Sequence, residues 1–562
     1  MDPKPLPAHP SLEQYKKQAK ELLKAYRSAD VETIRRVKRH HPRFEKLSEH
    51  SHVLPPGFDI SKFALADAQM VIAREHGFES WPKFAQRIEV INNAAAVRTN
   101  PVAAFIEAAI WHGTLEAAEA ILAAHPEIAR TSIHVAAILG DDAAVRRFIA
   151  VDPRNVTKKE APCEGDALVY LCLSKYLRLD KTRSEAFMRA AIALLDAGVN
   201  PNTGFWSKDE YHDFESAIYG AAAVSIHAGL TRLLLERGAD PNDVETPYHS
   251  PESYDNSALH VLVESRKLTA DSLTTMLLRK ADIHDYDGMK YLLEHGADPN
   301  RMTRWKFTAL HQAVRRDNRI ELIDLMLDNG ADPTVKNEVD GKSGIAMAAR
   351  RGRSDALWTF ARRGFPMPIP YDGVEHLIVS VCAARGGVAD ARAFAEQFQH
   401  LANAAILPKQ FNEARAIREL LAEGSTLLAE FAGNGNTKGV QQLLDLGVPV
   451  DALYGGDPYF DIAKDSTALH VAAWKAWPKT AKLLIERGAN VNAQDSKGRT
   501  PLMLAIKACV DSYWTNRRSP ESVEALLKAG AWVNGVEYPS GYAEVDSLLE
   551  QNSGNSAANA RE

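Results

Sequence analysis

Three histidines occupy the same position in a repeated stretch of this 562-residue chain. His260, His311 and His470 each follow an Ala-Leu pair that is itself preceded by Ser or Thr. Imidazole serves as a general acid or base near neutral pH and is also a common metal ligand. Recurrence in register therefore raises the possibility of a metal site or a catalytic site, and the elements that hold these side chains must decide it.

Other candidates for chemistry are weaker. The sequence has no P-loop, dinucleotide-binding, nucleophile-elbow or His-Glu-x-x-His motif. One further group of histidines lies in a polar, Pro-bounded stretch with no ligand spacing: His40, His41, His50 and His52. The cysteines lie far apart and form no Cys-x-x-Cys pair, which favours reduced, buried thiols: Cys163, Cys172, Cys382 and Cys509. We therefore expect no enzyme activity, no metal and no cofactor.

Composition and charge place the chain among ordinary soluble proteins. Apolar residues make up 45%, charged residues 25% and aromatic residues 8%, which excludes a disordered, collagen-like or disulfide-rich protein. No run of 18 apolar residues occurs, and the first ten residues carry prolines instead of a signal-peptide core. The expected location is cytoplasmic, without membrane contact. The net charge of -6 combines a basic first 50 residues with an acidic remainder.

Two short motifs recur along the chain and predict its elements. Leu-Leu-x-x-Gly-Ala-Asp-Pro-Asn occurs at 234–242 and 292–300, with weaker copies at 194–202, 326–334, 484–492 and 526–534. Upstream stand Ser-Ala-Leu-His at 257–260, Thr-Ala-Leu-His at 308–311 and 467–470, and Thr-Pro-Leu-Met at 500–503. The distance from Thr308 to Gly330 is 22 residues, the same as from Ser216 to Gly238.

Each repeated position has a physical role. A Ser or Thr hydroxyl can cap the first turn of a helix, and proline tolerates the next position. The Leu-Leu pair forms the apolar stripe of a second helix, which glycine ends in a left-handed conformation. Each copy therefore predicts a helix pair followed by a loop.

The two motifs together resemble the ankyrin repeat, whose period is 33 residues and whose mark is Thr-Pro-Leu-His-x-Ala. The resemblance implies an all-α ankyrin repeat solenoid of about eleven helix pairs with a helical N-terminal cap. It also implies that the repeat histidines belong to a structural hydrogen-bond network between neighbouring turns. Clear pairs are expected at 216–242, 257–300, 308–334, 467–492 and 500–534, and diverged pairs at 103–126, 131–153, 166–201, 343–366, 374–402 and 426–450.

The predicted domain organisation follows from these repeats. We expect a basic helical cap at 1–100, a first repeat block at 101–366, diverged ankyrin-like pairs at 367–450, a C-terminal block at 451–540 and a disordered tail at 551–562. Within the cap, Leu12–Arg27 is a basic amphipathic helix, and a second helix starting at Ala64 is expected to end near Gly77 and Pro82. The runs Leu-Ala-Asp-Ala-Gln and Gly-Phe-x-Ser-Trp-Pro resemble the leader of bacterial ankyrin repeat proteins. No nucleic-acid partner is expected, because the basic helix lacks interleaved aromatic residues.

Three loops between repeats, the fingers, exceed the compact length. Compact fingers such as Gly296 to Thr308 span 12 residues, whereas the fingers 198–216, 238–257 and 447–467 span 18, 19 and 20. The long fingers are rich in aromatic and acidic residues, and the compact finger contributes Trp305. Tyrosine and tryptophan are typical interface anchors.

The predicted function is a non-enzymatic scaffold for protein–protein interaction, because the resemblance implies that fingers and inner helices line a concave partner-binding groove. The partner is expected to be a protein or peptide, the acidic fingers favour a basic one, and the chain is expected to be a monomer. The candidate partner-binding residues are Trp206, Asp209, Tyr211, Asp213, Tyr248, Tyr254, Asp255, Trp305, Tyr454 and Tyr459. Two alternatives stay open: the aromatics pack finger against finger, or the acidic-aromatic groove binds a sugar or cationic metabolite, as an enzyme or binder.

Overall fold

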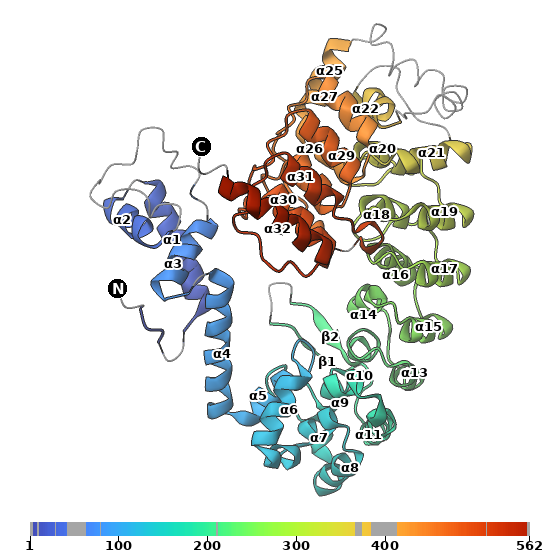
Figure 1. Ribbon diagram of the computed structural model, residues 1–562. Coiled ribbons are helices and arrows are strands. Elements are labelled where there is room, and N and C mark those ends of the chain that lie inside the picture. The colour runs from blue at the N-terminus through green and yellow to red at the C-terminus, as the bar shows by residue number, and fades with distance from the viewer. Residues whose placement is uncertain are drawn as a thin grey trace. The chain divides into compact units, whose positions relative to one another are not determined.

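The fold consists of consecutive helix pairs, as the repeats predicted, together with one small hairpin (Figure 1). The computed structural model describes residues 4–7, 10–28, 30–41, 63, 65–78, 80–208, 212–365, 374–383, 413–512 and 514–558. Most of the predicted pair at 374–402 therefore lies outside the described residues. None of the helices in the described part of the chain is long and apolar enough to span a membrane.

The repeated threonines cap their helices as predicted, whereas Ser257 does not, because the helix Ser257–Glu264 has Asn256 as its N-cap and no side-chain capping bond. The Thr308 hydroxyl accepts a hydrogen bond from the amide of His311 at 3.3 Å, and the His311 ring bonds back to Thr308, which forms a capping box. Gly330 has a φ of 87°, and the amide that follows it donates to the carbonyl of Met326 at 2.9 Å. This left-handed residue ends the second helix of the repeat.

The chain divides into two units, which we call unit 1 (Met1–Ser250 with Asp255–Lys267) and unit 2 (Pro251–Tyr254 with Leu268–Glu562). The predicted first repeat block, 101–366, therefore spans both units. The elements of unit 1 are α1 (Leu12–Arg27), α2 (Val31–His40), α3 (Leu65–Glu75), α4 (Trp81–Thr99), α5 (Pro101–Ala109), α6 (Leu115–Ala124), α7 (Ile133–Leu139), α8 (Asp142–Val151), α9 (Ala167–Cys172), α10 (Lys175–Leu179), α11 (Ser184–Asp196), β1 (Gly204–Trp206), β2 (Phe214–Ser216), α12 (Ala217–Tyr219), α13 (Ala228–Glu236), α14 (Glu245–His249) and α15 (Ser257–Glu264).

The N-terminal helices enclose a core of their own. Tyr15, Leu22 and Tyr26 of α1 pack with Val71 of α3 and Phe84 of α4. Helix α1 has the bounds that the sequence predicted, but Pro82 lies in the first turn of α4 and does not end α3. Proline is tolerated there because the first amides of a helix have no partner within the helix.

Helix α15 corrects the predicted pair at 257–300. The Ser-Ala-Leu-His motif at the start of α15 predicted the first helix of a pair. Helix α15 instead packs on α13, and α13 is the second helix of the preceding pair. The first helix of the following pair is α16 (Ala270–Asp282), which packs on both α17 (Tyr286–Glu294) and α18 (Ala309–Arg315). The extra helix α14 inside the second long finger shifts the register, so the Ser-Ala-Leu-His motif falls one helix later.

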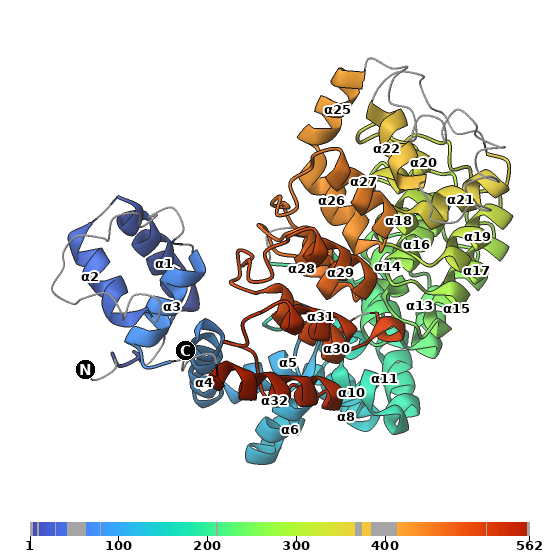
Figure 2. The same cartoon turned by 45° about the horizontal axis from the view of Figure 1, so that its top comes forward.

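Unit 2 stacks its first helices into two rows, one containing α16, α18 and α20 and the other α26, α28 and α30 (Figures 1 and 2). Helix α32 extends to Ala558, so most of the segment predicted to be disordered is helical, and the buried Val545 and Leu549 anchor its first half. The remaining elements are α19 (Ile320–Asp328), α20 (Gly344–Arg350), α21 (Ser354–Arg362), α22 (Val374–Ala383), α25 (Glu413–Ala422), α26 (Gly424–Gly433), α27 (Thr437–Asp445), α28 (Ala468–Trp474), α29 (Pro478–Glu486), α30 (Pro501–Asp511), α31 (Glu521–Lys528) and α32 (Ala543–Ala558).

A buried charge network joins the two rows of unit 2. Asp317, after α18, accepts from the Lys475 ammonium after α28 at 2.5 Å and from Arg351 at 3.0 and 3.2 Å. Arg351 also pairs with Glu430 of α26 at 3.1 Å, and Glu430 accepts from the Tyr454 hydroxyl at 2.7 Å. The side chain of Asp317 is only 7% exposed. Residues 158 positions apart in sequence are thus fixed to one another by charge.

We predict that Asp317→Asn destabilises unit 2 by about 3 kcal/mol or more, because it leaves the buried Lys475 and Arg351 without their counter-charge. Burial raises the pKa of Asp317, but Arg351 and Lys475 outweigh it, so the pKa lies well below its ordinary value. A carboxylate whose pKa is lower in the folded state than in the unfolded state contributes its full stabilisation above the unfolded pKa of about 4. That stabilisation is lost as the pH falls below this value. Urea unfolding should therefore show the wild type and variant converging in acid.

Asp324→Asn is the matched control. Asp324 pairs with Arg363 at 2.6 Å, but both side chains are about one-third exposed, so its loss should cost less than about 1 kcal/mol. Equal costs for the two substitutions would show that the Asp317 network contributes no more than a surface ion pair.

We also predict that Gly330→Ala costs about 1 kcal/mol through backbone strain alone. A Cβ at Gly330 would meet no atom within 4 Å, so its φ of 87° is the cause of the strain. Gly455 offers the control, since a Cβ there is equally free of neighbours and its φ is not in the left-handed range. Chemical denaturation that finds equal effects for Gly330→Ala and Gly455→Ala would contradict the helix-ending role.

Candidate binding surfaces

The first long finger contains the hairpin, which holds Trp206 at the surface of unit 1. Strands β1 and β2 are antiparallel and place Trp206 opposite Phe214. Successive side chains of a strand point to opposite faces. Phe205 is accordingly buried, and its ring meets that of Trp111 edge-to-face at 5.7 Å, whereas Trp206 is 57% exposed. One face of the hairpin thus packs against unit 1, and the other face is exposed to solvent.

The exposed face of the hairpin is aromatic. The ring of Trp206 stacks on His212 at 5.2 Å with an interplanar angle of 18°, and it meets Phe214 at 5.2 Å. Asp213 closes the hairpin through its backbone, since its carbonyl accepts from Ser207 at 2.8 Å and its amide donates to the Ser207 hydroxyl at 2.9 Å. Two predicted site residues, Asp209 and Tyr211, lie outside the described residues.

Acidic residues of the second long finger serve local structure. Asp243 accepts from the Thr246 amide at 2.8 Å and from the Ser216 hydroxyl, and burial raises its pKa. Asp255 accepts from the amide of Ser257 at 3.0 Å, and hydrogen bonds to Ser257 lower its pKa. Tyr248 is half-buried, with its ring edge-to-face to His249 at 4.7 Å. These contacts fix α14 and the start of α15.

Two predicted tyrosines meet at the C-terminal end of α16 in unit 2. The Tyr254 hydroxyl donates to the carbonyl of Ile283 at 2.5 Å, and the Tyr459 hydroxyl donates to the carbonyl of Asp282. The Arg316 guanidinium lies 3.4 Å from the centre of the Tyr459 ring. Burial raises the pKa of Tyr459 to about 12. Both tyrosines thus satisfy carbonyls that the helix leaves unpaired.

The other two predicted aromatics in unit 2 also make internal contacts. Tyr454 is 8% exposed, belongs to the Asp317 network through Glu430, and has a pKa raised by burial. Trp305 is half-buried in the compact finger, with the Arg304 guanidinium 4.4 Å from its ring centre.

The predicted site residues therefore belong to two different units. Trp206 and Asp213 share the hairpin of unit 1, whereas Tyr254 and Tyr459 share a helix end in unit 2. Phe214 and His212 complete the aromatic face around Trp206, and His212 is the one that sequence reasoning missed. The sequence offers no hairpin signal here, because Phe205 and Trp206 are adjacent and the connection to Phe214 contains no glycine. Asp282 and Arg316 have no local signal either.

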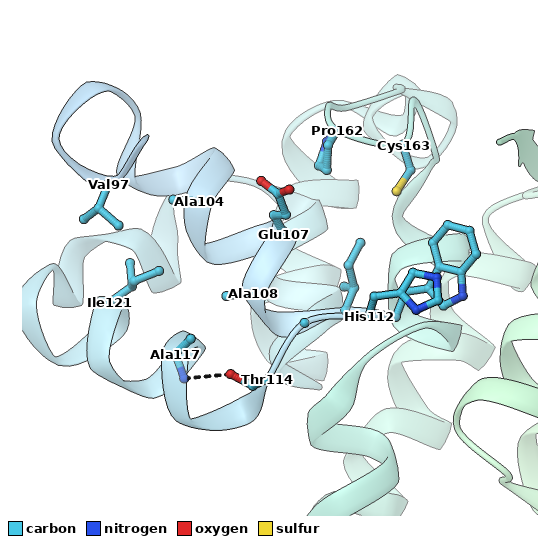
Figure 3. A pocket seen from close by; sticks show the side chains of 13 residues that line it. Val97, Ala104, Glu107, Ala108, His112, Thr114, Ala117, Ile121, Pro162 and Cys163 are labelled. Carbon is cyan, nitrogen blue, oxygen red and sulfur yellow. Dashed lines mark hydrogen bonds between the residues drawn. The ribbon is translucent and has the colours of Figure 1, made fainter. Parts of the chain in front are cut away.

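A cavity of about 480 Å³ lies in unit 1 between α5, α6 and residues 162–163 (Figure 3). Its lining is largely apolar, with Glu107, His112 and Cys163 as the titratable side chains among the lining residues. Burial raises the pKa of the Cys163 thiol to about 11, so the thiol is protonated at neutral pH and is a poor nucleophile. Thr114 at the rim caps α6 by accepting from the amide of Ala117 at 3.3 Å.

The recurrent histidines are structural where the repeat motif is complete. His470 bonds through Nδ1 to the Thr467 hydroxyl at 2.9 Å and through Nε2 to the carbonyl of Arg499 at 3.0 Å. His311 repeats this arrangement with Thr308 and the carbonyl of Lys342. Each ring thus joins one repeat to the next, as the resemblance implied. Within the described ranges, no group of three His, Cys, Asp or Glu side chains could hold a metal ion.

Comparisons with known proteins agree with this architecture. A family model described as "Ankyrin repeats (3 copies)" matches residues 269–337, 393–495 and 427–535. Serine/threonine-protein kinase 12 of Arabidopsis thaliana is 36% identical over 84 residues, which is 15% of this chain and 17% of that protein. Rabankyrin-5 of Homo sapiens is 39% identical over 64 residues, 11% of this chain and 6% of that protein. The chain thus spans less than a fifth of either relative.

Among solved structures, the human ASB11 ankyrin repeat domain is 24% identical, with a TM-score of 0.33, and the match covers 42% of this chain and all of that one. The family-model matches begin at residue 269, so the resemblance of residues 65–82 to a bacterial leader stays a prediction. The helix pairs, the capping boxes and the matched segments together establish that this chain carries ankyrin repeats, a general protein–protein interaction module, and that its fold is the ankyrin repeat fold.

Proposed function

We propose that the chain is a non-enzymatic scaffold that binds a protein partner, and that the hairpin of unit 1 is a docking surface with Trp206 as its anchor. The observation that carries this proposal is the 57% exposure of Trp206 on a strand whose opposite face is buried. Tryptophan is one of the residue types that are enriched among interface hot spots. Ankyrin repeats supply the general context of protein binding.

The hairpin holds its anchor in place before any partner arrives. Phe205 fixes β1 against Trp111, and the indole nitrogen of Trp111 donates to the Tyr219 hydroxyl at 3.1 Å. Trp206 itself is held by its stacking on His212. An aromatic side chain that is already ordered loses little conformational entropy on binding. The same contacts leave most of the Trp206 ring available to a partner.

The acidic residues of the long fingers support partner binding less than the sequence suggested. The carboxylates of Asp243 and Asp255 serve helix starts within unit 1, and those of Glu252 and Asp461 pair with nearby cations in unit 2. A basic partner, a concave groove, a monomeric state and a cytoplasmic location all stay predictions. No observation favours the alternative of a sugar or cationic metabolite in the acidic-aromatic segments, since the same internal contacts occupy those carboxylates.

The test compares two equally exposed tryptophans. Trp206→Ala should weaken partner binding by about 2 kcal/mol or more, which is about thirtyfold in Kd, because a hot-spot ring is lost. Trp532→Ala removes an indole that is 60% exposed in unit 2 and should leave affinity unchanged. Partners are first captured with the wild-type chain, and Kd is then measured with the purified partner for all three proteins.

Thermal unfolding separates binding from packing. The Tm of Trp206→Ala should lie close to that of the wild type, since the ring is more than half exposed. A lowered Tm with intact affinity would show that Trp206 packs the finger and does not dock a partner. Equal losses of affinity for both tryptophan variants would also contradict the proposal.

A further inference from the structure

A second cavity of about 480 Å³ lies entirely within unit 2. It opens where the turns between paired helices converge: His284 follows α16, Arg319 precedes α19, Trp477 precedes α29, and residues 514–517 connect α30 to α31. The complete lining is Tyr254, His284, Asp317, Arg319, Trp477, Trp514, Asn516 and Arg517. The volume is typical of small-molecule sites.

Two arginines give this cavity positive charge that no ion pair within the described part of the chain neutralises. Neither Arg319 nor Arg517 forms an ion pair with any described residue, although both line the cavity. The Nε atom of Arg517 is buried and has no hydrogen-bond partner in the described part of the chain. Burial lowers the pKa of Arg517 to about 10, which leaves the guanidinium charged at neutral pH. A buried donor without an acceptor is costly, so an acceptor supplied by a ligand would be favoured.

The guanidinium of Arg517 also contacts two aromatic rings. It lies 4.1 Å from the ring centre of Trp477 and 5.4 Å from that of Trp514. A guanidinium stacked on aromatic faces keeps its N–H groups free in its own plane. Those groups match the geometry of a carboxylate or phosphate, which can accept two of them at once.

The remaining titratable groups around the cavity do not cancel this charge. Asp317 is already bound by Lys475 and Arg351. Arg353, behind it, pairs with Asp355 at 2.9 Å. Burial lowers the pKa of His284 to about 4, with Arg353 and Arg319 acting in the same direction against Asp317. His284 is therefore neutral at pH 7, and the charged lining side chains Asp317, Arg319 and Arg517 together carry one net positive charge.

We propose that this cavity binds a small organic anion in which a phosphate or carboxylate group is attached to a planar ring. The anionic group lies between Arg319 and Arg517, and the ring lies against Tyr254, which lines the cavity and is 67% exposed. The site belongs to unit 2 and takes a small anion, which is a different activity from partner binding by the hairpin of unit 1.

The test titrates the full-length chain with phenyl phosphate, benzoate, inorganic phosphate and phenol, using calorimetry and tryptophan fluorescence. Phenyl phosphate or benzoate should bind saturably, and the tighter of the two identifies the anionic group. Inorganic phosphate and phenol should each bind at least about tenfold more weakly, since each lacks half of the contacts. No saturable binding of either ring anion, or phenol binding as tightly as phenyl phosphate, would overturn the proposal.

Variants assign the binding to the cavity. Arg517→Gln and Arg319→Gln should each weaken ring-anion binding at least about tenfold, and Arg517→Lys should weaken it less, because the charge stays but the planar fork is lost. Arg304→Gln is the matched control, since Arg304 also stacks on a tryptophan, Trp305, outside the cavity. Equal weakening by Arg304→Gln would show attraction to general surface charge and overturn the assignment. Arg319 is exposed, so its variant tests the proposal even if Arg517→Gln misfolds.

Discussion

Unit 2 depends on a carboxylate that is almost fully removed from water. Asp317 can be buried only because Lys475 and Arg351 reach it from other helices. A buried charge without counter-charges costs several kcal/mol, whereas a paired one is tolerated. The positions of α18, α20 and α28 relative to each other are therefore constrained to the few ångströms over which these ion pairs form. Packing of neighbouring repeats alone would impose no such constraint.

This constraint changes how the repeat array behaves. In a simple solenoid each repeat touches only its neighbours, and stability is close to a sum of local terms. In unit 2, Lys475 and Tyr459 contact residues 158 and 177 positions earlier in the chain. These contacts close a long loop, and opening one row of helices exposes the charges of the other. Unit 2 should consequently unfold as a more cooperative body than its repeat sequence implies.

Features set by local chemistry could be predicted from the sequence. The caps at Thr308 and Thr467, the left-handed Gly330 and the bounds of α1 follow from residues within one or two helical turns. Features set by distant contacts could not. Ser257 carries the start signal of a first helix, yet α15 packs as a second helix because α14 precedes it.

The candidate site shows the same division. Aromatic residues in long fingers were expected to face a partner, but a tyrosine that faces a partner and one that caps a helix have the same sequence signature. The surroundings of each ring decide: Tyr454 donates to a buried glutamate, and Tyr459 lies beneath Arg316 at a helix end. The rings of His212 and Phe214, in the same hairpin, lie beside Trp206, and its indole is exposed.

Exposure alone does not make an aromatic residue an anchor, since many surface side chains are apolar. What distinguishes Trp206 is that the strand beneath it is fixed: Phe205, its immediate neighbour, is 6% exposed and packs on Trp111. Because successive side chains of a strand point to opposite faces, the burial of Phe205 leaves Trp206 on the exposed face. The cavity of unit 2 resembles this arrangement, because the guanidinium of Arg517 lies over the ring of Trp477 in the same unit. In both units, the energy that orders the exposed group comes from packing within the chain, so a ligand need not supply it.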